Sequence, residues 1–117
     1  MGLPPSNRLR KRQDFRRVYQ HGICLHSSHL ILRALASSQL SSPLIGISIS
    51  QKVSKKAVIR NRLKRQIRGV FRDLLPLLSP DWKIVVVVKP KAIECRYEDF
   101  LRELKQLLVK AKIINGY

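Results

Sequence analysis

Acidic residues are scarce in this 117-residue chain, which has 7 Asp and Glu against 24 Lys and Arg and a formal net charge of +17. Cysteine is scarce as well, since the chain has only Cys24 and Cys95. Two cysteines cannot supply the disulfide framework of a small secreted domain. The longest strongly apolar run, Ile84–Val88, is too short to span a bilayer, and residues 1–6 lack the apolar core of a signal peptide. These shortages exclude secreted, disulfide-stapled and membrane-spanning proteins. We expect a small cytoplasmic protein with a polyanionic partner and no membrane partner.

The basic residues are concentrated in two blocks. Residues 1–20 carry six bases against the single acid Asp14, and residues 52–72 carry nine bases and no acid. Between them, residues 21–51 have only Arg33. An acid-free block of this density repels itself unless a polyanion neutralises it, and Arg, which outnumbers Lys in both blocks, suits phosphate groups. The distribution therefore predicts nucleic acid as the partner.

Hydrophobic periodicity predicts a single domain over residues 1–117. An extended basic arm over residues 1–10 is followed by three helices, expected over 12–20, 55–75 and 97–110. Extended segments are expected over 23–36, 44–50 and 82–89. Ser54 is the expected N-cap of the second helix, and Pro76 ends it. The order αβββαβα predicts an α+β fold, a two-layer α/β sandwich around a small mixed sheet.

The second helix is predicted to be amphipathic. At 100° per residue, one stripe is apolar and a second is polar and cationic. The apolar stripe contains Ile59, Leu63, Ile67, Val70 and Leu74, and the cationic stripe contains Asn61, Arg65, Arg68 and Arg72. The strand before this helix alternates isoleucine with Gly46, Ser48 and Ser50, so one of its faces is small enough for close approach.

No arrangement of residues points to catalysis by the polypeptide. Asp99 and Glu103 share a helix face at i, i+4, but solvated helix carboxylates have the same spacing. Neither a glycine-rich phosphate loop nor a nucleophile elbow is found in the sequence. We therefore predict no catalytic residues in the chain.

Four possible zinc ligands lie within nine residues: His21, Cys24, His26 and His29. A zinc knuckle usually takes its ligands from two separated pairs, and the sequence contains no second pair. An extended chain would also send Cys24 and His26 to one side and His29 to the other. We therefore predict no metal site here.

Phe15 and Tyr19 have two possible roles. Two aromatic residues at i, i+4 are typical of a helix that docks on a core. Because they lie among Arg12, Arg16 and Arg17, they also fit a surface on which nucleic-acid bases stack. Their spacing favours the core, and the sequence leaves both roles open.

The segment Ser50–Arg65, centred on Arg60-Asn61-Arg62, resembles the signature of the bacterial ribonuclease P protein subunit. The resemblance extends from the segment beginning at Asn7 to the Tyr97–Leu108 helix. It implies a ribonucleoprotein endoribonuclease in which the RNA subunit performs the Mg²⁺-dependent removal of the 5′ leader from precursor tRNA. The protein would bind the catalytic RNA and the leader, and Mg²⁺ would be held mainly by the catalytic RNA and substrate. The implied fold is shared with a ribosomal-protein domain and contains a left-handed βαβ crossover.

The resemblance also implies roles for individual residues. Contacts with the catalytic RNA are implied for Arg60, Asn61, Arg62, Lys64, Arg65, Arg68, Lys52 and Lys56. Contacts with the leader are implied for Phe15, Tyr19, Arg33, Arg12 and Arg16. Arg33 stands where relatives often have an aromatic residue, Gln51 where a Lys is common, and Ser54 where Gly is usual.

Two other functions remain as alternatives. A structural ribosomal protein would share the fold and the charge. A stand-alone nuclease would use the carboxylates near the C-terminus.

Overall fold

The computed structural model describes residues 2–38 and 40–114 of the chain. Its helices are α1 (Arg12–His21), α2 (Ala57–Leu74) and α3 (Tyr97–Lys110), and its strands are β1 (Ile23–His26), β2 (Leu30–Ala36), β3 (Leu44–Ser48) and β4 (Trp82–Val88). Short 3₁₀ turns occupy Pro5–Asn7, Leu75–Leu77 and Pro90–Glu94. The predicted order αβββαβα is confirmed.

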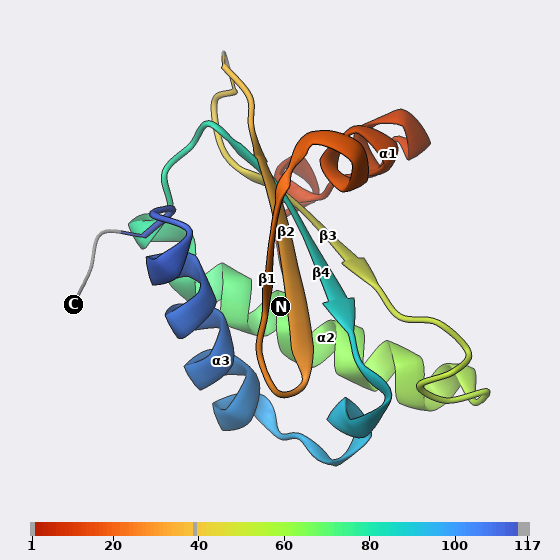
Figure 1. The fold of residues 1–117 in the computed structure, drawn as a ribbon. Coiled ribbons are helices and arrows are strands. Elements are labelled where there is room, and N and C mark those ends of the chain that lie inside the picture. The colour runs from red at the N-terminus through yellow and green to blue at the C-terminus, as the bar shows by residue number, and fades with distance from the viewer. Residues whose placement is uncertain (1, 39, 115–117) are drawn as a thin grey trace.

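The strands form one mixed sheet in the order β1-β2-β4-β3. The β1–β2 and β2–β4 pairs are antiparallel, and β3 and β4 are parallel. Two parallel neighbours need a crossover connection, which is provided here by α2. In Figure 1 both strands run down the page with β3 to the right of β4, and α2 passes behind the sheet. The crossover is therefore left-handed, as the family resemblance implies and against the general rule.

The main core lies between the sheet and the layer formed by α2 and α3 (Figure 1). In α2 the buried residues are Leu63, Ile67, Val70, Phe71 and Leu74. This confirms the predicted apolar stripe, except that Ile59 is only half-buried. Complete burial of each large apolar side chain contributes roughly 1.5–3 kcal/mol, which offsets the mutual repulsion of the bases on α2.

Helix α1 packs on the other face of the sheet, against β2 and β4. A smaller apolar cluster of Leu9, Val18 and Val85 holds it there. Because side chains alternate along a strand, Leu30, Leu32 and Ala34 face the main core, while Arg33 between them faces the side of α1.

The N-terminal arm, predicted to be extended, contains the 3₁₀ turn and packs on the edge of β3. Leu3 and Leu9 of this arm are buried, although the sequence predicted only an extended basic arm. The Asn7 side chain donates to the Pro43 carbonyl at 2.9 Å, and the Leu9 N–H donates to the Ile45 carbonyl at 2.9 Å. These contacts fix the position of Arg8, between Asn7 and Leu9.

Some predicted boundaries are wrong. Helix α2 begins at Ala57, and its N-cap position is Lys56 rather than Ser54. The Ser54 hydroxyl instead accepts from the Lys56 N–H at 3.1 Å, so it stabilises the turn before the helix. The extended segment 23–36 is divided by a turn into β1 and β2. None of the helices within the described ranges is long and apolar enough to cross a membrane.

Candidate RNA-binding site

A basic groove runs between the N-terminal arm, β3 and the cationic side of α2. One part is lined by Arg8, Asn61, Lys64, Arg65 and Arg68, together with Gly2, and has a volume of about 350 Å³. The adjoining part, of about 370 Å³, shares Arg8, Lys64 and Arg68 with the first and also contains Arg10, Phe15 and Gly46. We call the six polar residues Arg8, Arg10, Asn61, Lys64, Arg65 and Arg68 the basic groove.

The positive charges of the basic groove have no acidic partner within residues 2–38 and 40–114. None of the salt bridges formed by the described residues involves Arg8, Lys64, Arg65 or Arg68. Partial burial, and then the positive charge of Arg8, lower the pKa of the Arg68 guanidinium. Two guanidinium groups held close together in this way favour an anion between them, and phosphate is the anion that arginine binds best.

The other bases predicted to contact RNA lie around the first turns of α2, outside the groove. Lys52 is exposed in the loop that precedes α2, and Lys56 is exposed at the N-cap of the helix. Arg60 donates to the Ser54 carbonyl at 2.8 Å, and Arg62 donates to the Ile93 carbonyl at 3.0 Å. The structure thus brings Asn61, Lys64, Arg65 and Arg68 together and leaves the other four apart from them.

Phe15 and Tyr19 have different surroundings, although both belong to α1. Phe15 is half-buried over Gly46, where an added Cβ would come within 2.5 Å of the ring. It packs against the small cluster of Leu9, Val18 and Val85 and also lines the basic groove. This confirms the prediction that β3 has a face open to close approach. Phe15 is therefore a packing residue whose position also borders the groove.

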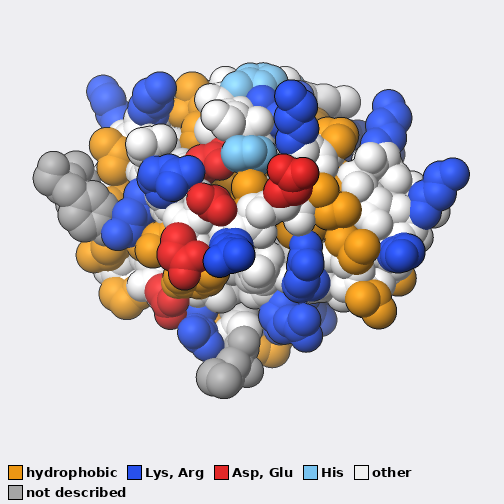
Figure 2. Space-filling view, turned by 90° about the horizontal axis from the view of Figure 1, so that it is seen from below, with side chains coloured by type: hydrophobic (Ala, Val, Ile, Leu, Met, Phe, Trp, Pro, Cys, Tyr) orange, Lys and Arg blue, Asp and Glu red, His pale blue; other side chains and the backbone are white. Residues whose placement is uncertain are grey.

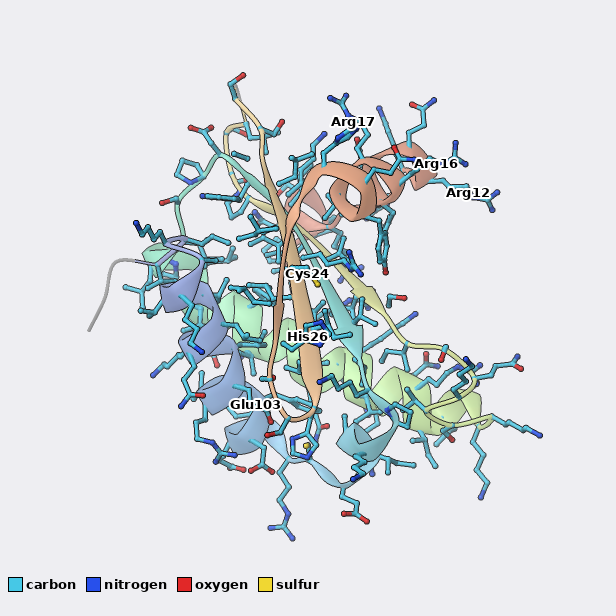
Figure 3. All side chains as sticks on the ribbon, viewed as in Figure 1. Arg12, Arg16, Arg17, Cys24, His26 and Glu103 are labelled. Atoms are coloured by element: carbon cyan, nitrogen blue, oxygen red, sulfur yellow. The ribbon has the colours of Figure 1, made fainter. Side chains whose placement is uncertain are left out.

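Tyr19 is 38% exposed, and the Arg33 guanidinium lies over its ring, 4.8 Å from the ring centre. The buried Nε of Arg33 has no hydrogen-bond partner in the part of the chain that the structure describes. We call Phe15, Tyr19 and Arg33 the aromatic patch. Arg12 and Arg16 project from the outer side of α1, away from the sheet (Figure 3). They therefore lie beside the patch without forming part of it.

Arg8 and Arg10 are site residues that sequence reasoning did not assign. Both were recognised as bases of the arm, but their place depends on the pairing of the arm with β3, which joins Arg8 to Ile45. The available signal was the sequence Arg8-Leu9-Arg10. An apolar residue between two bases is typical of an edge segment that buries one side chain and exposes its neighbours.

The histidine and cysteine cluster is divided as predicted. The Cys24 Sγ lies 3.6 Å from the His26 Nε2. On the neighbouring strand β2, Cys24 lies opposite Arg33 and His26 lies opposite Ile31. His29 lies instead against α3, with its Nδ1 2.6 Å from the Glu103 Oε2. The labelled Cys24, His26 and Glu103 side chains of Figure 3 show this separation.

The two carboxylates at i, i+4 on α3 have structural partners. Asp99 accepts from the Arg96 N–H at 2.9 Å at the start of α3, and this bond is the main reason that its pKa is lowered. Glu103 is buried and hydrogen-bonded to Ser27 and His29.

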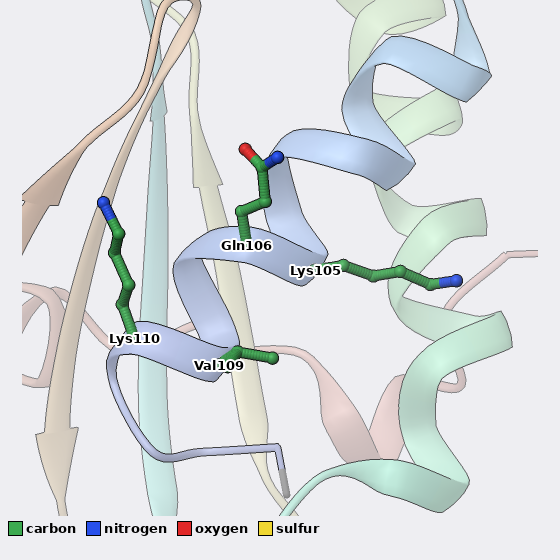
Figure 4. A pocket seen from close by; sticks show the side chains of 4 residues that line it. All are labelled: Lys105, Gln106, Val109 and Lys110. Carbon is green, nitrogen blue, oxygen red and sulfur yellow. The ribbon is translucent and has the colours of Figure 1, made fainter. Parts of the chain in front are cut away.

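A separate hollow of about 580 Å³ on α3 is lined by Lys105, Gln106, Val109 and Lys110 (Figure 4). It shares no lining residue with the basic groove.

A cationic groove bordered by Phe15, with Tyr19 exposed on the same helix of a small α+β domain, defines an RNA-binding protein. The chain belongs to the ribonuclease P protein family, whose sequence profile matches residues 3–112. It is 58% identical over 120 residues to the ribonuclease P protein component of Microcystis aeruginosa, with each chain covered completely. The corresponding protein of a Cyanothece species is also 58% identical, over 130 residues that cover 98% of this chain and 99% of the relative.

Solved structures of the family share the fold. The ribonuclease P protein of Staphylococcus aureus is 27% identical with a TM-score of 0.84, covering 93% of this chain and 98% of that one. The protein of Thermotoga maritima is 27% identical with a TM-score of 0.78, covering 88% and 96%. The resemblance inferred from the Arg60-Asn61-Arg62 segment is therefore confirmed. Membership associates the chain with a tRNA-processing endoribonuclease and implies ribonuclease P RNA as its partner.

Proposed function

We propose that this protein assists the ribonuclease P RNA in removing the 5′ leader of precursor tRNA, with the RNA bound along the basic groove and the leader on the aromatic patch. The observation that carries the proposal is the continuity of the two surfaces. Phe15 borders the groove that contains Arg8, Lys64 and Arg68, and it lies on the same helix as Tyr19. A single protein surface can thus contact the catalytic RNA and the strand to be cleaved together.

The basic groove suits a folded RNA backbone. Its arginines offer planar guanidinium groups to phosphate oxygens, and α2 holds Lys64, Arg65 and Arg68 within five residues. Folded RNA is recognised mostly through its shape, phosphates and 2′-hydroxyl groups, so a rigid helix with spaced cations supplies the required contacts. Arg60, Arg62, Lys52 and Lys56 would extend this surface around the first turns of α2.

The aromatic patch suits a single strand. The Tyr19 ring is exposed, and base–aromatic stacking contributes about 1–3 kcal/mol per base with little dependence on sequence. Arg33 adds a positive charge beside the ring, and the exposed Arg12 and Arg16 would contact leader phosphates from the outer side of α1. Tolerance of base identity is what a protein needs to accept leaders of different tRNAs.

In this proposal the RNA carries out the hydrolysis in the cytoplasm. Mg²⁺ would be held by the catalytic RNA and the substrate, because Lys52–Arg72 contains no carboxylate that could act as a hard oxygen ligand on this side of α2. The basic groove would contribute by bringing the two RNAs together and lowering their mutual repulsion. The family assignment favours this role over that of a structural ribosomal protein.

Reconstitution tests the proposal directly. Purified protein is added to a bacterial ribonuclease P RNA at physiological Mg²⁺ with precursor tRNA, and the 5′ cleavage rate is measured. We expect the protein to increase the rate. No increase would contradict the proposal, and cleavage by the protein without RNA would support the stand-alone nuclease.

Tyr19→Ala is expected to weaken holoenzyme binding of leader-bearing tRNA by about 5-fold to 100-fold, which corresponds to the loss of one stacked base. Tyr19 is exposed, so the free energy of unfolding should change little. The measurement is the Kd of the holoenzyme for precursor tRNA and for mature tRNA. Tyr19→Phe, which keeps the ring, is the matched control and should bind both RNAs as the unchanged protein does. An equal loss of affinity for both RNAs in Tyr19→Ala would contradict a leader contact.

A further inference from the structure

Three side chains of metal-ligating type meet beyond the end of the β1–β2 hairpin. They are His29 in the hairpin turn, Cys95 after the Pro90–Glu94 turn, and Glu103 on α3. One ligand atom from each lies within 4.8 Å of the others. The labelled Glu103 in Figure 3 lies at the far end of the molecule from Arg12, Arg16 and Arg17. None of the three residues lines the basic groove or belongs to the aromatic patch.

The Glu103 carboxylate is held in one orientation. Its Oε1 accepts from the Ser27 hydroxyl and from the His29 N–H, the latter at 2.9 Å. This leaves Oε2 directed toward the His29 Nδ1, at 2.6 Å. Metal sites use the same device, in which the second oxygen of a ligating carboxylate is fixed by hydrogen bonds from neighbouring groups.

The region around these three side chains is richer in acidic residues than the rest of the protein, and Arg102 is a base that also acts on Cys95. Four of the chain's seven acids lie within residues 94–103. Figure 2 shows acidic side chains gathered near a histidine on this face, with Lys and Arg mostly around them.

We infer that His29 Nδ1, Cys95 Sγ and Glu103 Oε2 bind one Zn²⁺ ion, with water in the fourth position. Nitrogen, sulfur and carboxylate oxygen together suit zinc, whereas Mg²⁺ and Ca²⁺ avoid sulfur. Zinc bonds of about 2.0–2.3 Å in tetrahedral geometry put neighbouring ligand atoms about 3.3–3.5 Å apart. The His29 Nδ1 and the Glu103 Oε2, now 2.6 Å apart, therefore separate by about 0.7 Å as the ion enters between them, and the Cys95 Sγ completes the set. The thiol proton and any proton on Nδ1 pass to solvent as the two metal bonds form.

The ion has access to these ligands from solvent. The His29 side chain is 29% exposed, while Cys95 and Glu103 are buried behind it. A bound ion would join the hairpin turn to the Pro90–Glu94 turn and α3, and 74 residues separate His29 from Glu103. The site would therefore stabilise the fold in addition to binding the ion.

Titration of the reduced full-length chain with Co²⁺ tests this inference, because Co²⁺ takes the same ligands as zinc and is coloured. We expect a thiolate-to-Co²⁺ charge-transfer band and the visible bands of four-coordinate Co²⁺, both removed by one equivalent of Zn²⁺. Cys95→Ser should abolish the charge-transfer band and weaken Zn²⁺ binding by at least about tenfold. Cys24→Ser is the matched control, since Cys24 also lies near a histidine, and it should keep the band.

A second variant keeps the test independent of the folding of Cys95→Ser. Glu103→Gln retains the shape of the side chain and an oxygen that can accept from Ser27, but loses the charge. It should fold, by circular dichroism, and bind Zn²⁺ at least about tenfold more weakly. Absence of a charge-transfer band in the unchanged protein at excess Co²⁺ would overturn the inference. A band that survives in Cys95→Ser but is lost in Cys24→Ser would do the same.

Discussion

Replacing Arg8 and Arg68 together with alanine is expected to weaken binding to the ribonuclease P RNA by about 100-fold or more. Both side chains line both parts of the basic groove, and neither has an acidic partner among the described residues. Each hydrogen bond to a charged group contributes about 1.5–3 kcal/mol, so the loss of two phosphate contacts accounts for the factor. The slope of log K against log salt should fall by about two units, one for each contact.

A matched double variant separates local contacts from net charge. Arg102→Ala with Lys110→Ala removes the same charge from α3, outside the basic groove. We expect its affinity to change by less than about threefold and its salt slope to change by less than half a unit. Affinity and slope are measured by filter binding or fluorescence over a range of salt concentrations. Equal losses in the two double variants would mean that only net charge matters and that the groove binds no phosphate.

The sequence was sufficient to predict the elements because each depends on a local pattern. The spacing of Leu63, Ile67, Val70 and Leu74 along α2 identifies the buried side of that helix whatever it packs against. The same spacing predicts that Arg65 and Arg68 lie on the exposed side. Membership of the family followed from the short segment around Arg60-Asn61-Arg62. These inferences needed no knowledge of which elements are neighbours.

The composition of the sites depends on contacts between distant segments, which periodicity does not encode. Arg8 enters the basic groove because Asn7 bonds to Pro43, 36 residues further on. His29 meets Glu103, 74 residues away, and not the nearer Cys24. The prediction of Ser54 as the N-cap of α2 is also wrong, because the backbone turn before the helix places Lys56 at that position. Sequence reasoning therefore identified the side of α2 that lines the groove but not the arm that completes it.

Phe15 and Tyr19 show the same limit within one helix. They lie on one face of α1, so the sequence could not distinguish packing from stacking. The distinction comes from the sheet beneath them, where glycine at position 46 makes room for the Phe15 ring and Arg33 lies against the Tyr19 ring. The role of each aromatic residue depends on which strand residue it contacts. That contact is fixed by the path of the chain as it leaves α1 and enters β1.

That junction makes Gly22→Ala a damaging substitution. An added Cβ at position 22 would lie 2.6 Å from the Val18 carbonyl oxygen and 2.7 Å from that of Ala34. Both contacts are with backbone, so the last turn of α1 must move away from β2. Overpacking of this kind costs about 1–3 kcal/mol, measured as a loss in the free energy of unfolding by urea. Because Tyr19 lies one turn before Gly22, its contact with Arg33 should be disturbed and the affinity for precursor tRNA should fall.

Gly69→Ala is the control, with the opposite expected sign. Gly69 lies inside α2, and the nearest atom to an added Cβ there is the Tyr97 Cε2 at 3.7 Å, an ordinary van der Waals contact. Alanine in a helix interior is favoured over glycine by about 0.5–1 kcal/mol, so this variant should be more stable and should bind precursor tRNA unchanged. If Gly22→Ala were as stable as the unchanged protein and still distinguished precursor from mature tRNA, the close packing of α1 on β2 would not be what positions Tyr19. The pair of variants thus tests whether leader recognition depends on one helix–strand junction.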